Sequence, residues 1–259
     1  MKWKSHRAIA QAIALEMGLS DELEKALCAG SVEPDKRPDR AFKVSAKGRE
    51  YIGRAPHHRP PTGTIMAYAW RSRRAYLQGN DYWAVKSLGR ALHYVQDKCV
   101  TTGYKGRRHD HMEEEIADLA PPPSAVRRGL DLAVCSPLFV RECVTAARPR
   151  RDPRSALYEA TLFSSAIFAS VIGPVEAEER FEGEYRRAIM THRLRYAAGA
   201  TTVASTTMAA YAFGQPFLAL IGGAAAVVMV KGHRSFYRLR DEAEWYGLEW
   251  PPVRPDKNK

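Results

Sequence analysis

Apolar residues recur at helical spacing along most of this chain. Ser5, a residue type that caps helices, stands before a first periodic run, so we expect a helix that begins there and ends at Gly18. Ser20, followed by acidic residues that favour a helix N-terminus, predicts a second helix that stops at Gly30.

The segment 31–61 is rich in proline, glycine and charged residues, and we expect it to be irregular. No alternating pattern of useful length predicts a strand anywhere in the chain. Residues 1–173 are therefore predicted to form an all-α, multi-helix domain. Its further helices are expected at 62–78, from Asn80 or Asp81 through His93, from about His109, at 124–134, at 137–147 and at 155–172.

The character of the chain changes after Pro174, where residues 174–250 form the second predicted domain. Residues 196–230 contain no charged side chain, and a break at 214–216 divides them into two apolar halves rich in small residues. Each half is near or slightly below the roughly 17 to 25 residues that span a bilayer. We predict a C-terminal apolar helical hairpin that meets the membrane. A pair of buried helices in a soluble protein is the alternative, and 251–259 is predicted to be a disordered tail.

Charge and cysteine content restrict the partners and the compartment. The formal charge of +11 and the pI near 9.6 favour anionic partners, but the basic runs lack the interleaved aromatic residues of a nucleic-acid platform, so no specific nucleic-acid partner is indicated. Basic residues flank the apolar segment on both sides, which places both of its ends in the cytoplasm. The four cysteines show no CxxC spacing, so neither a disulfide framework nor a thiolate metal site is indicated. We expect them to be small buried residues of a protein in a reduced compartment. The N-terminus lacks the features of a secretory signal.

The segment 91–115 holds more potential metal ligands than any other part of the chain. His93 and Asp97 are four residues apart in a helical segment, so their side chains lie on one face about 5 to 6 Å apart at Cβ and can share a cation. Such a pair alone is common on solvated helix faces. Six of the eight histidines fall within the first 111 residues, and this clustering indicates a shared site.

A second imidazole and carboxylate pair follows a short loop. It is either His109 with Glu113 or His111 with Glu115, again four residues apart at the start of a helix. Because the loop is short, the two helices are expected to be antiparallel neighbours. Imidazole and carboxylate ligands without thiolate are more typical of a catalytic zinc site than of a structural one.

Three further positions supply donors closer to the N-terminus. His6 is expected on the first turn of the first helix, while Asp35 and the pair His57 and His58 fall in the predicted loop 31–61. Loops held by a helical scaffold can bring ligands over a site. We expect Asp35 and one of the two adjacent histidines to take part in the site, and ordinary polar groups of a loop are the alternative for each.

The order of these residues resembles the zinc-dependent phospholipase C superfamily, which also contains single-strand-specific nucleases. The resemblance covers residues 3 to 115 and begins with Trp3 beside His6. It implies that Asp35 is both a ligand and a candidate catalytic base, and that Asp97 bridges two metals. Carried over residue by residue, the implied metal ligands are His6, Asp35, His58 or His57, His93, Asp97, His109 and Glu113, with His111 and Glu115 fitting the last spacing too.

The chain departs from the family pattern at two positions. Family members commonly have a histidine six residues after the bridging aspartate, where this chain has Gly103, so His111 or the second of the adjacent histidines would have to substitute. The family's tryptophan is the mature N-terminal residue and ligates through its free amine, whereas here it is Trp3. We expect one to three zinc ions, with two as the prediction.

The resemblance implies a phosphodiesterase that hydrolyses a phospholipid or related phosphodiester with a metal-activated water. The apolar segment 196–230 would hold it at the cell membrane, with the catalytic domain facing the cytoplasm. Three alternatives stay open: a nuclease of the same superfamily, a different all-α metal phosphohydrolase centred on His109 and Asp110, and a non-catalytic membrane-tethered domain with a degenerate metal site. The second of these leaves His6 and His93 without a role.

Overall fold

A computed structural model of the chain describes residues 1–45, 48–56, 60–100, 107–174 and 179–248. Within these ranges the chain forms eleven helices and one two-stranded sheet, so the all-α prediction is confirmed. The chain divides into two compact units, Met1–Pro174 and Val175–Lys259. The helices of the first unit are α1 (Trp3–Glu16), α2 (Asp21–Lys36), α3 (Thr62–Leu77), α4 (Asp81–Lys98), α5 (Arg107–Ala117), α6 (Pro123–Leu132), α7 (Pro137–Ala146) and α8 (Pro153–Ile172).

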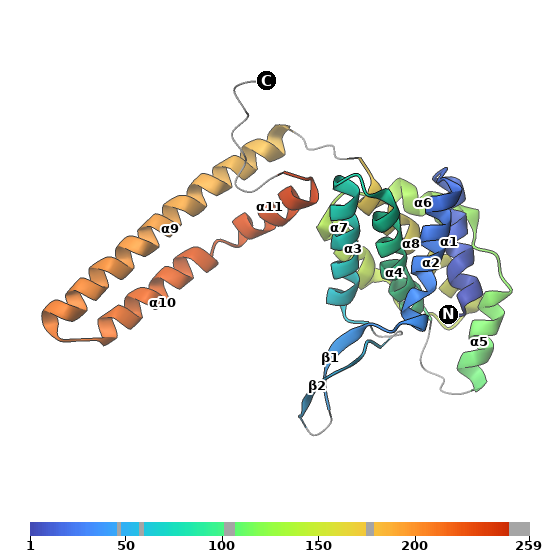
Figure 1. The fold of residues 1–259 in the computed structure, drawn as a ribbon, viewed down its shortest axis with the longest axis horizontal. Helices are drawn as coiled ribbons and strands as arrows, with labels where there is room; N and C mark the ends of the chain where they lie inside the picture. The colour runs from blue at the N-terminus through green and yellow to red at the C-terminus, as the bar shows by residue number, and fades with distance from the viewer. Residues whose placement is uncertain (46–47, 57–59, 101–106, 175–178, 249–259) are drawn as a thin grey trace. The chain divides into compact units, whose positions relative to one another are not determined.

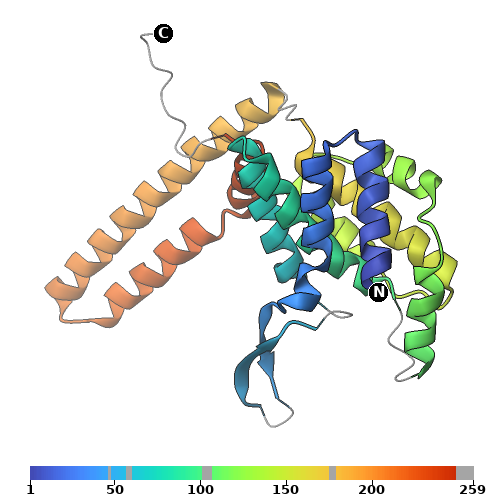
Figure 2. The ribbon, with the colours of Figure 1, turned by 45° about the vertical axis from the view of Figure 1, so that its right-hand side comes forward.

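Helix α4 is the core of the first unit. Twelve of its residues are buried, and they lie on every face of the helix. Helices α2, α3 and α8 pack directly against it, α1 lies on α2, and α6 and α7 lie on α8 (Figures 1 and 2). A helix surrounded in this way buries its polar side chains together with its apolar ones. The polar side chains therefore need hydrogen-bond or ion-pair partners inside the protein.

Several predicted helix starts are confirmed by side-chain caps. Ser20 accepts a hydrogen bond from the Leu23 amide, and Asn80 accepts one from the Trp83 amide. The prediction for Ser5 is wrong: α1 begins at Trp3, and Ser5 is buried inside its first turn. Each cap satisfies one of the backbone donors that a helix N-terminus leaves without an intrahelical partner.

Helix α2 does not stop at Gly30 but continues to Lys36. Gly30 lies where α2 crosses α4, and a Cβ atom built on it would be 2.1 Å from the carbonyl oxygen of Lys86. The glycine therefore permits close helix packing and does not end the helix. As a result Asp35, predicted in a loop, lies on the last turn of α2.

The segment predicted as irregular contains an antiparallel hairpin of β1 (Arg40–Val44) and β2 (Glu50–Arg54). The strands are five residues each, too short for their alternation to stand out from the surrounding charged sequence. Gly48 has φ +73, a left-handed conformation that favours glycine in the turn. In Figure 1 the hairpin extends away from the helices of the first unit.

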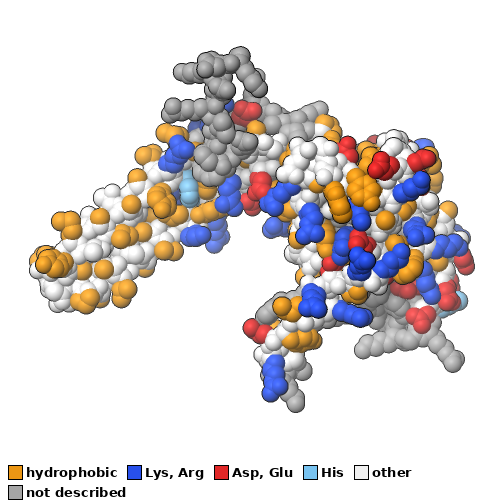
Figure 3. Space-filling model, in the orientation of Figure 1, with side chains coloured by type: hydrophobic (Ala, Val, Ile, Leu, Met, Phe, Trp, Pro, Cys, Tyr) orange, Lys and Arg blue, Asp and Glu red, His pale blue; other side chains and the backbone are white. Residues whose placement is uncertain are grey.

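The second unit consists of α9 (Glu179–Phe213), α10 (Phe217–Lys231) and α11 (Arg234–Trp245). Helix α9 packs against both α10 and α11. The chain reverses at Gly214, with φ +63, and Gly222 of α10 contacts Thr206 of α9 so closely that a Cβ atom would be 1.8 Å from its hydroxyl oxygen. We call residues 196–230 the apolar arm. Figure 3 shows that no charged side chain lies on its visible face.

Length and composition alone identify α8 as a helix that could cross a membrane, in the part of the chain that the structure describes. In the fold, 61% of its most apolar stretch is buried, as expected for a core helix of the first unit. Helices α10 and α11 meet the same criterion only together, with a bend of 46° between them. Membrane insertion of the apolar arm stays a prediction.

Candidate metal centre

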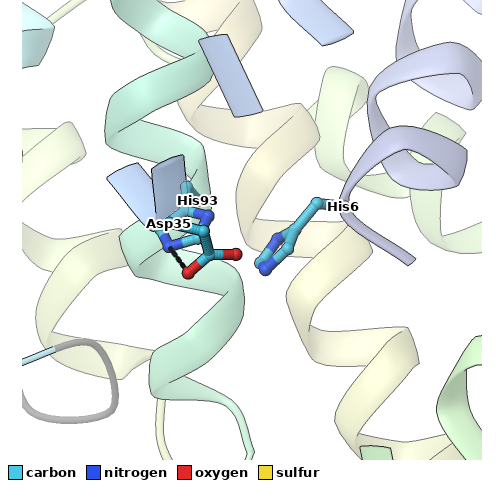
Figure 4. A group of neighbouring side chains, drawn as sticks. All are labelled: His6, Asp35 and His93. Atoms are coloured by element: carbon cyan, nitrogen blue, oxygen red, sulfur yellow. Dashed lines mark ion pairs between the residues drawn. The ribbon is translucent and has the colours of Figure 1, made fainter. Parts of the chain in front are cut away.

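Three side chains from three helices converge at the end of the first unit where α1 begins. His6 comes from the first turn of α1, Asp35 from the last turn of α2, and His93 from the interior of α4. One possible ligand atom from each lies within 4.8 Å of the other two. Figure 4 shows the three side chains pointing toward one another.

Hydrogen bonds on the far side of each imidazole set its orientation. His6 Nδ1 lies 2.6 Å from Gln96 Oε1, and the amide nitrogen of Gln96 donates to Ser164 Oγ at 3.1 Å, which fixes the amide orientation. His93 Nδ1 lies 2.8 Å from the carbonyl oxygen of Ser31, which can only accept. Because both Nδ1 atoms donate, Nε2 of each ring is the nitrogen that faces the cluster.

Asp97 lies between the two imidazoles. Its Oδ1 atom is 3.3 Å from His6 Nε2, and its Oδ2 atom is 3.3 Å from His93 Nε2. Asp35 Oδ1 is 3.7 Å from the same nitrogen of His93. Both imidazoles and Asp97 are buried, whereas the side chain of Asp35 is 26% exposed. Asp35 is thus the most solvent-accessible of these four groups.

The α-amino group of Met1 also reaches the cluster. It is buried, 2.5 Å from Asp97 Oδ1 and 2.9 Å from Glu113 Oε1. Burial alone would lower the pKa of this amine, but the Asp97 and Glu113 carboxylates outweigh it and raise the pKa. The side chain of Trp3, in contrast, is 46% exposed and lies beneath the Lys36 ammonium group.

The remaining predicted ligands are placed differently. His111 is not brought to the cluster: its side chain is 69% exposed, and its Nε2 atom is 3.0 Å from Glu115 Oε1. The histidines at 57 and 58 lie outside the described residues. His109 belongs to α5, but its side chain is outside the described part of the structure.

Hydrogen bonds and an ion pair at Asp39 hold the chain in place just beyond Asp35. The carboxylate accepts hydrogen bonds from the Tyr68 hydroxyl at 2.5 Å and the Tyr94 hydroxyl at 2.7 Å, and it pairs with Arg90 at 2.6 Å. Burial, followed by the hydrogen bond to Asp39, raises the pKa of Tyr68 to about 12. These contacts tie the end of α2 to α3 and α4 and so hold Asp35 in place.

The donor set fits a divalent cation. Among the described side chains, the cluster contains two imidazoles, three carboxylates (Asp35, Asp97 and Glu113) and a single ammonium group, that of Met1. The Nε2 atom of His6 is buried and has no hydrogen-bond partner within the described part of the chain. With the proton on Nδ1, the Nε2 lone pair faces Asp97 Oδ1 at 3.3 Å, and a cation coordinated there would offset both this repulsion and the excess of negative charge.

Sequence reasoning missed three contributors to this site. Gln96 and Ser31 orient the imidazoles, and the Met1 amine occupies a place between two carboxylates. Gln96 carried a usable signal, because it follows His93 by three residues on a helix and so shares its face. A backbone carbonyl and a chain terminus carry no such signal.

Comparisons with protein-family models, with characterised proteins and with solved structures find no match for this chain. The chemistry of the site therefore has to be argued from its own geometry.

Proposed function

We propose that the chain is a membrane-associated, zinc-dependent phosphodiesterase of the phospholipase C type, which hydrolyses a phospholipid or related phosphodiester. The convergence of His6, Asp35 and His93 within 4.8 Å of one another carries this proposal. The donors come from three separate helices, and their order along the chain resembles that of the zinc-dependent phospholipase C superfamily. A non-catalytic site and a nuclease of the same superfamily are the outcomes against which it is tested.

Each residue has a distinct task in the proposed reaction. His6, His93 and Asp97 are buried and held by hydrogen bonds or ion pairs, so they suit the task of binding the cation with little rearrangement. Asp35 is more exposed and suits the task of orienting a water molecule or accepting its proton. A zinc ion bound here would lower the pKa of a coordinated water and polarise a phosphate oxygen.

A second cation position is proposed next to Asp97. The Met1 amine lies between Asp97 and Glu113, two of the carboxylates that the resemblance assigns as ligands. Its nitrogen is within contact distance of both, where a positive charge is already favoured. We therefore propose that this place between Asp97 and Glu113 suits a second cation, and that Asp97 is the carboxylate shared by two cations.

The apolar arm supports the membrane part of the proposal. It exposes large apolar side chains along both α9 and α10, among them Met208, Tyr211 and Leu220. Soluble monomers seldom expose contiguous apolar surface of this kind, and such surfaces commonly mark a membrane or protein contact. The basic residues on both flanks favour a membrane with anionic lipid.

The test compares two histidines that differ in placement. His93→Ala removes a ligand of the cluster, whereas His111→Ala removes an exposed histidine outside it. We expect purified wild-type protein and His111→Ala to contain equal zinc and to hydrolyse phosphatidylcholine in mixed micelles. His93→Ala and Asp97→Asn are expected to lose zinc and about a hundredfold or more in rate, since the ion supplies the nucleophile.

Three results would argue against the proposal in different ways. Hydrolysis that survives both a chelator and Asp97→Asn would exclude the metal mechanism. Zinc bound without hydrolysis of any phosphodiester would favour a structural site. Zinc-dependent cleavage of single-stranded DNA, with phospholipid untouched, would assign the nuclease.

A further inference from the structure

The charged side chains nearest the apolar arm are all basic, and acidic residues begin only further along its flanks, where Glu182 pairs with Arg186 and Asp241 pairs with Arg240. From Tyr185 to Arg240 the sequence contains no aspartate or glutamate. All basic residues of this stretch lie outside the arm, on its two flanks: Arg186, Arg187, Arg193, Arg195, Lys231, Arg234, Arg238 and Arg240. The arm is thus a neutral apolar hairpin, and the first charged side chains on both of its flanks are basic.

A groove of about 500 Å³ runs between α9 and α10 at the base of the arm. Tyr196, Gly199 and Val203 line it from α9, and Ala226 and Val230 line it from α10. A Cβ atom on Gly199 would be 3.4 Å from that of Ala226, so the two helices lie close together at this level. The groove is therefore narrow and lined mainly by aliphatic and small side chains.

Lys231 lines the groove at its basic end. It is the first charged residue after the arm, and its ammonium group is 5.9 Å from the ring centroid of Tyr237 on α11. The side chain thus places a cation where the apolar walls end. A long aliphatic stem with a terminal ammonium group suits the boundary between acyl chains and headgroups.

We propose that this groove binds one molecule of anionic phospholipid, with an acyl chain between α9 and α10 and the phosphate on Lys231. The lipid acts as an anchor and is separate from the substrate of the metal centre. The proposal rests on the membrane part of the proposed function and does not depend on hydrolysis. Basic clusters next to an apolar helix attract anionic headgroups, and the apolar walls exclude a fully polar ligand.

Charge argues against a second copy of the chain as the occupant. Two copies joined through this groove would bring the basic residues nearest the arm, Arg193, Arg195, Lys231 and Arg234, toward those of the other copy, with no acidic residue between Tyr185 and Arg240. Like charges that face each other across an interface oppose association. An anionic lipid has the complementary charge.

The test uses full-length protein and two pairs of matched variants. Ala200 lines the groove, so Ala200→Leu fills it, while Ala198→Leu makes the same change on an exposed residue of α9 outside the lining. Lys231→Gln removes the cation at the groove, and Arg186→Gln removes one from an exposed position ten residues before the arm. Each protein is floated with phosphatidylcholine vesicles with or without phosphatidylglycerol. Native mass spectrometry in mild detergent then counts the lipid that is retained.

We expect wild type, Ala198→Leu and Arg186→Gln to retain one phosphatidylglycerol per chain. Ala200→Leu is expected to retain none, and the Lys231→Gln adduct should be about fivefold weaker, as for loss of one basic residue near a membrane. Equal retention in all five proteins, or none in a wild type that still floats, would overturn the groove proposal alone. A dimer that Ala200→Leu converts to monomer would assign the groove to a second copy. Failure of wild type to bind vesicles, with zinc-dependent hydrolysis intact, would overturn both the anchor and the membrane association.

Discussion

The substitution Gly30→Ala tests the link between helix packing and the metal centre. A Cβ atom at this position would be 2.1 Å from the Lys86 carbonyl oxygen and 3.2 Å from the Cα atom of Gly89. Both neighbours are backbone atoms of α4, which cannot rotate away as a side chain can. Helix α2 therefore has to move away from α4 to accept a single methyl group.

The size of the effect follows from this distance. A carbon and a carbonyl oxygen in contact are about 3.3 Å apart, so α2 has to shift by about 1 Å near residue 30. Overpacking of this kind costs about 1 to 3 kcal/mol, and the better helix propensity of alanine returns up to about 1 kcal/mol. For a unit of this size, a net loss of about 1 to 2 kcal/mol lowers the melting temperature by about 2 to 8 °C.

The same shift reaches the proposed metal centre. Asp35 is five residues further along α2, and its carboxylate is 3.7 Å from His93 on α4. We expect Gly30→Ala to weaken zinc binding as well as stability, because a displaced ligand lengthens its bond to the ion. Zinc affinity is measured by competition with a chromophoric chelator, and stability by thermal and urea unfolding followed by circular dichroism.

Gly63→Ala is the matched control. Gly63 is also a helical glycine of the first unit, but an added Cβ atom has no neighbour within 4 Å among the described residues. This control should be neutral or more stable by up to about 1 kcal/mol, with unchanged zinc affinity. If Gly30→Ala melts at the same temperature as Gly63→Ala, the close crossing of α2 and α4 is wrong, and the positioning of Asp35 needs another explanation.

Three further predictions concern other contacts. Gln96→Leu leaves the Nδ1 donor of His6 without its acceptor. Zinc affinity should then fall about 10- to 100-fold, as it does when other groups that orient a metal ligand are removed. Unchanged zinc affinity, measured by chelator competition, would refute this role of Gln96. Glu113→Gln removes one of the two carboxylates at the second proposed cation position, so the zinc content should fall by up to one ion per chain, while Glu115→Gln, at an exposed pair outside the cluster, should have no effect. Burial lowers the pKa of His192 and His233 below the ordinary value of 6.5. The unfolded chain therefore binds more protons than the folded chain as the pH falls below that value, which favours unfolding. We expect the packing of α11 on α9 to loosen between about pH 7 and about pH 5. Hydrogen exchange of α11 measures this loosening, and slower exchange at the lower pH would contradict it.

Helix starts and the central ligand pair could be predicted because their causes are local. The Ser20 and Asn80 caps act within one turn, and helical spacing alone puts His93 and Asp97 on one face. The same local logic failed at Gly30, since a glycine that ends a helix and one that admits a neighbouring helix look alike in sequence. Only the position of α4 separates the two cases.

Other parts of the site depend on contacts that no spacing rule describes. The Met1 amine reaches Asp97 across 96 positions of sequence, and the Ser31 carbonyl that orients His93 belongs to the backbone of a different helix. His111 shows the opposite error. Its spacing to Glu115 satisfied the expected pattern, but α5 turns that pair toward solvent. Pattern matching therefore finds candidate donors, and tertiary packing selects among them.

The location of the polar residues in α4 bears on whether the site has a function. His93, Gln96 and Asp97 lie within a helix that is buried on all faces, where apolar residues would pack without needing partners. A fold that needed only stability would gain from replacing them, since buried ionic groups seldom add more stability than well-packed apolar ones. Their arrangement instead aims two imidazole nitrogens at a shared carboxylate, with a more exposed aspartate beside them. Buried charged and polar groups of this kind cost stability unless they are compensated, and a bound cation would compensate them, so the position of these residues supports the proposed cation site.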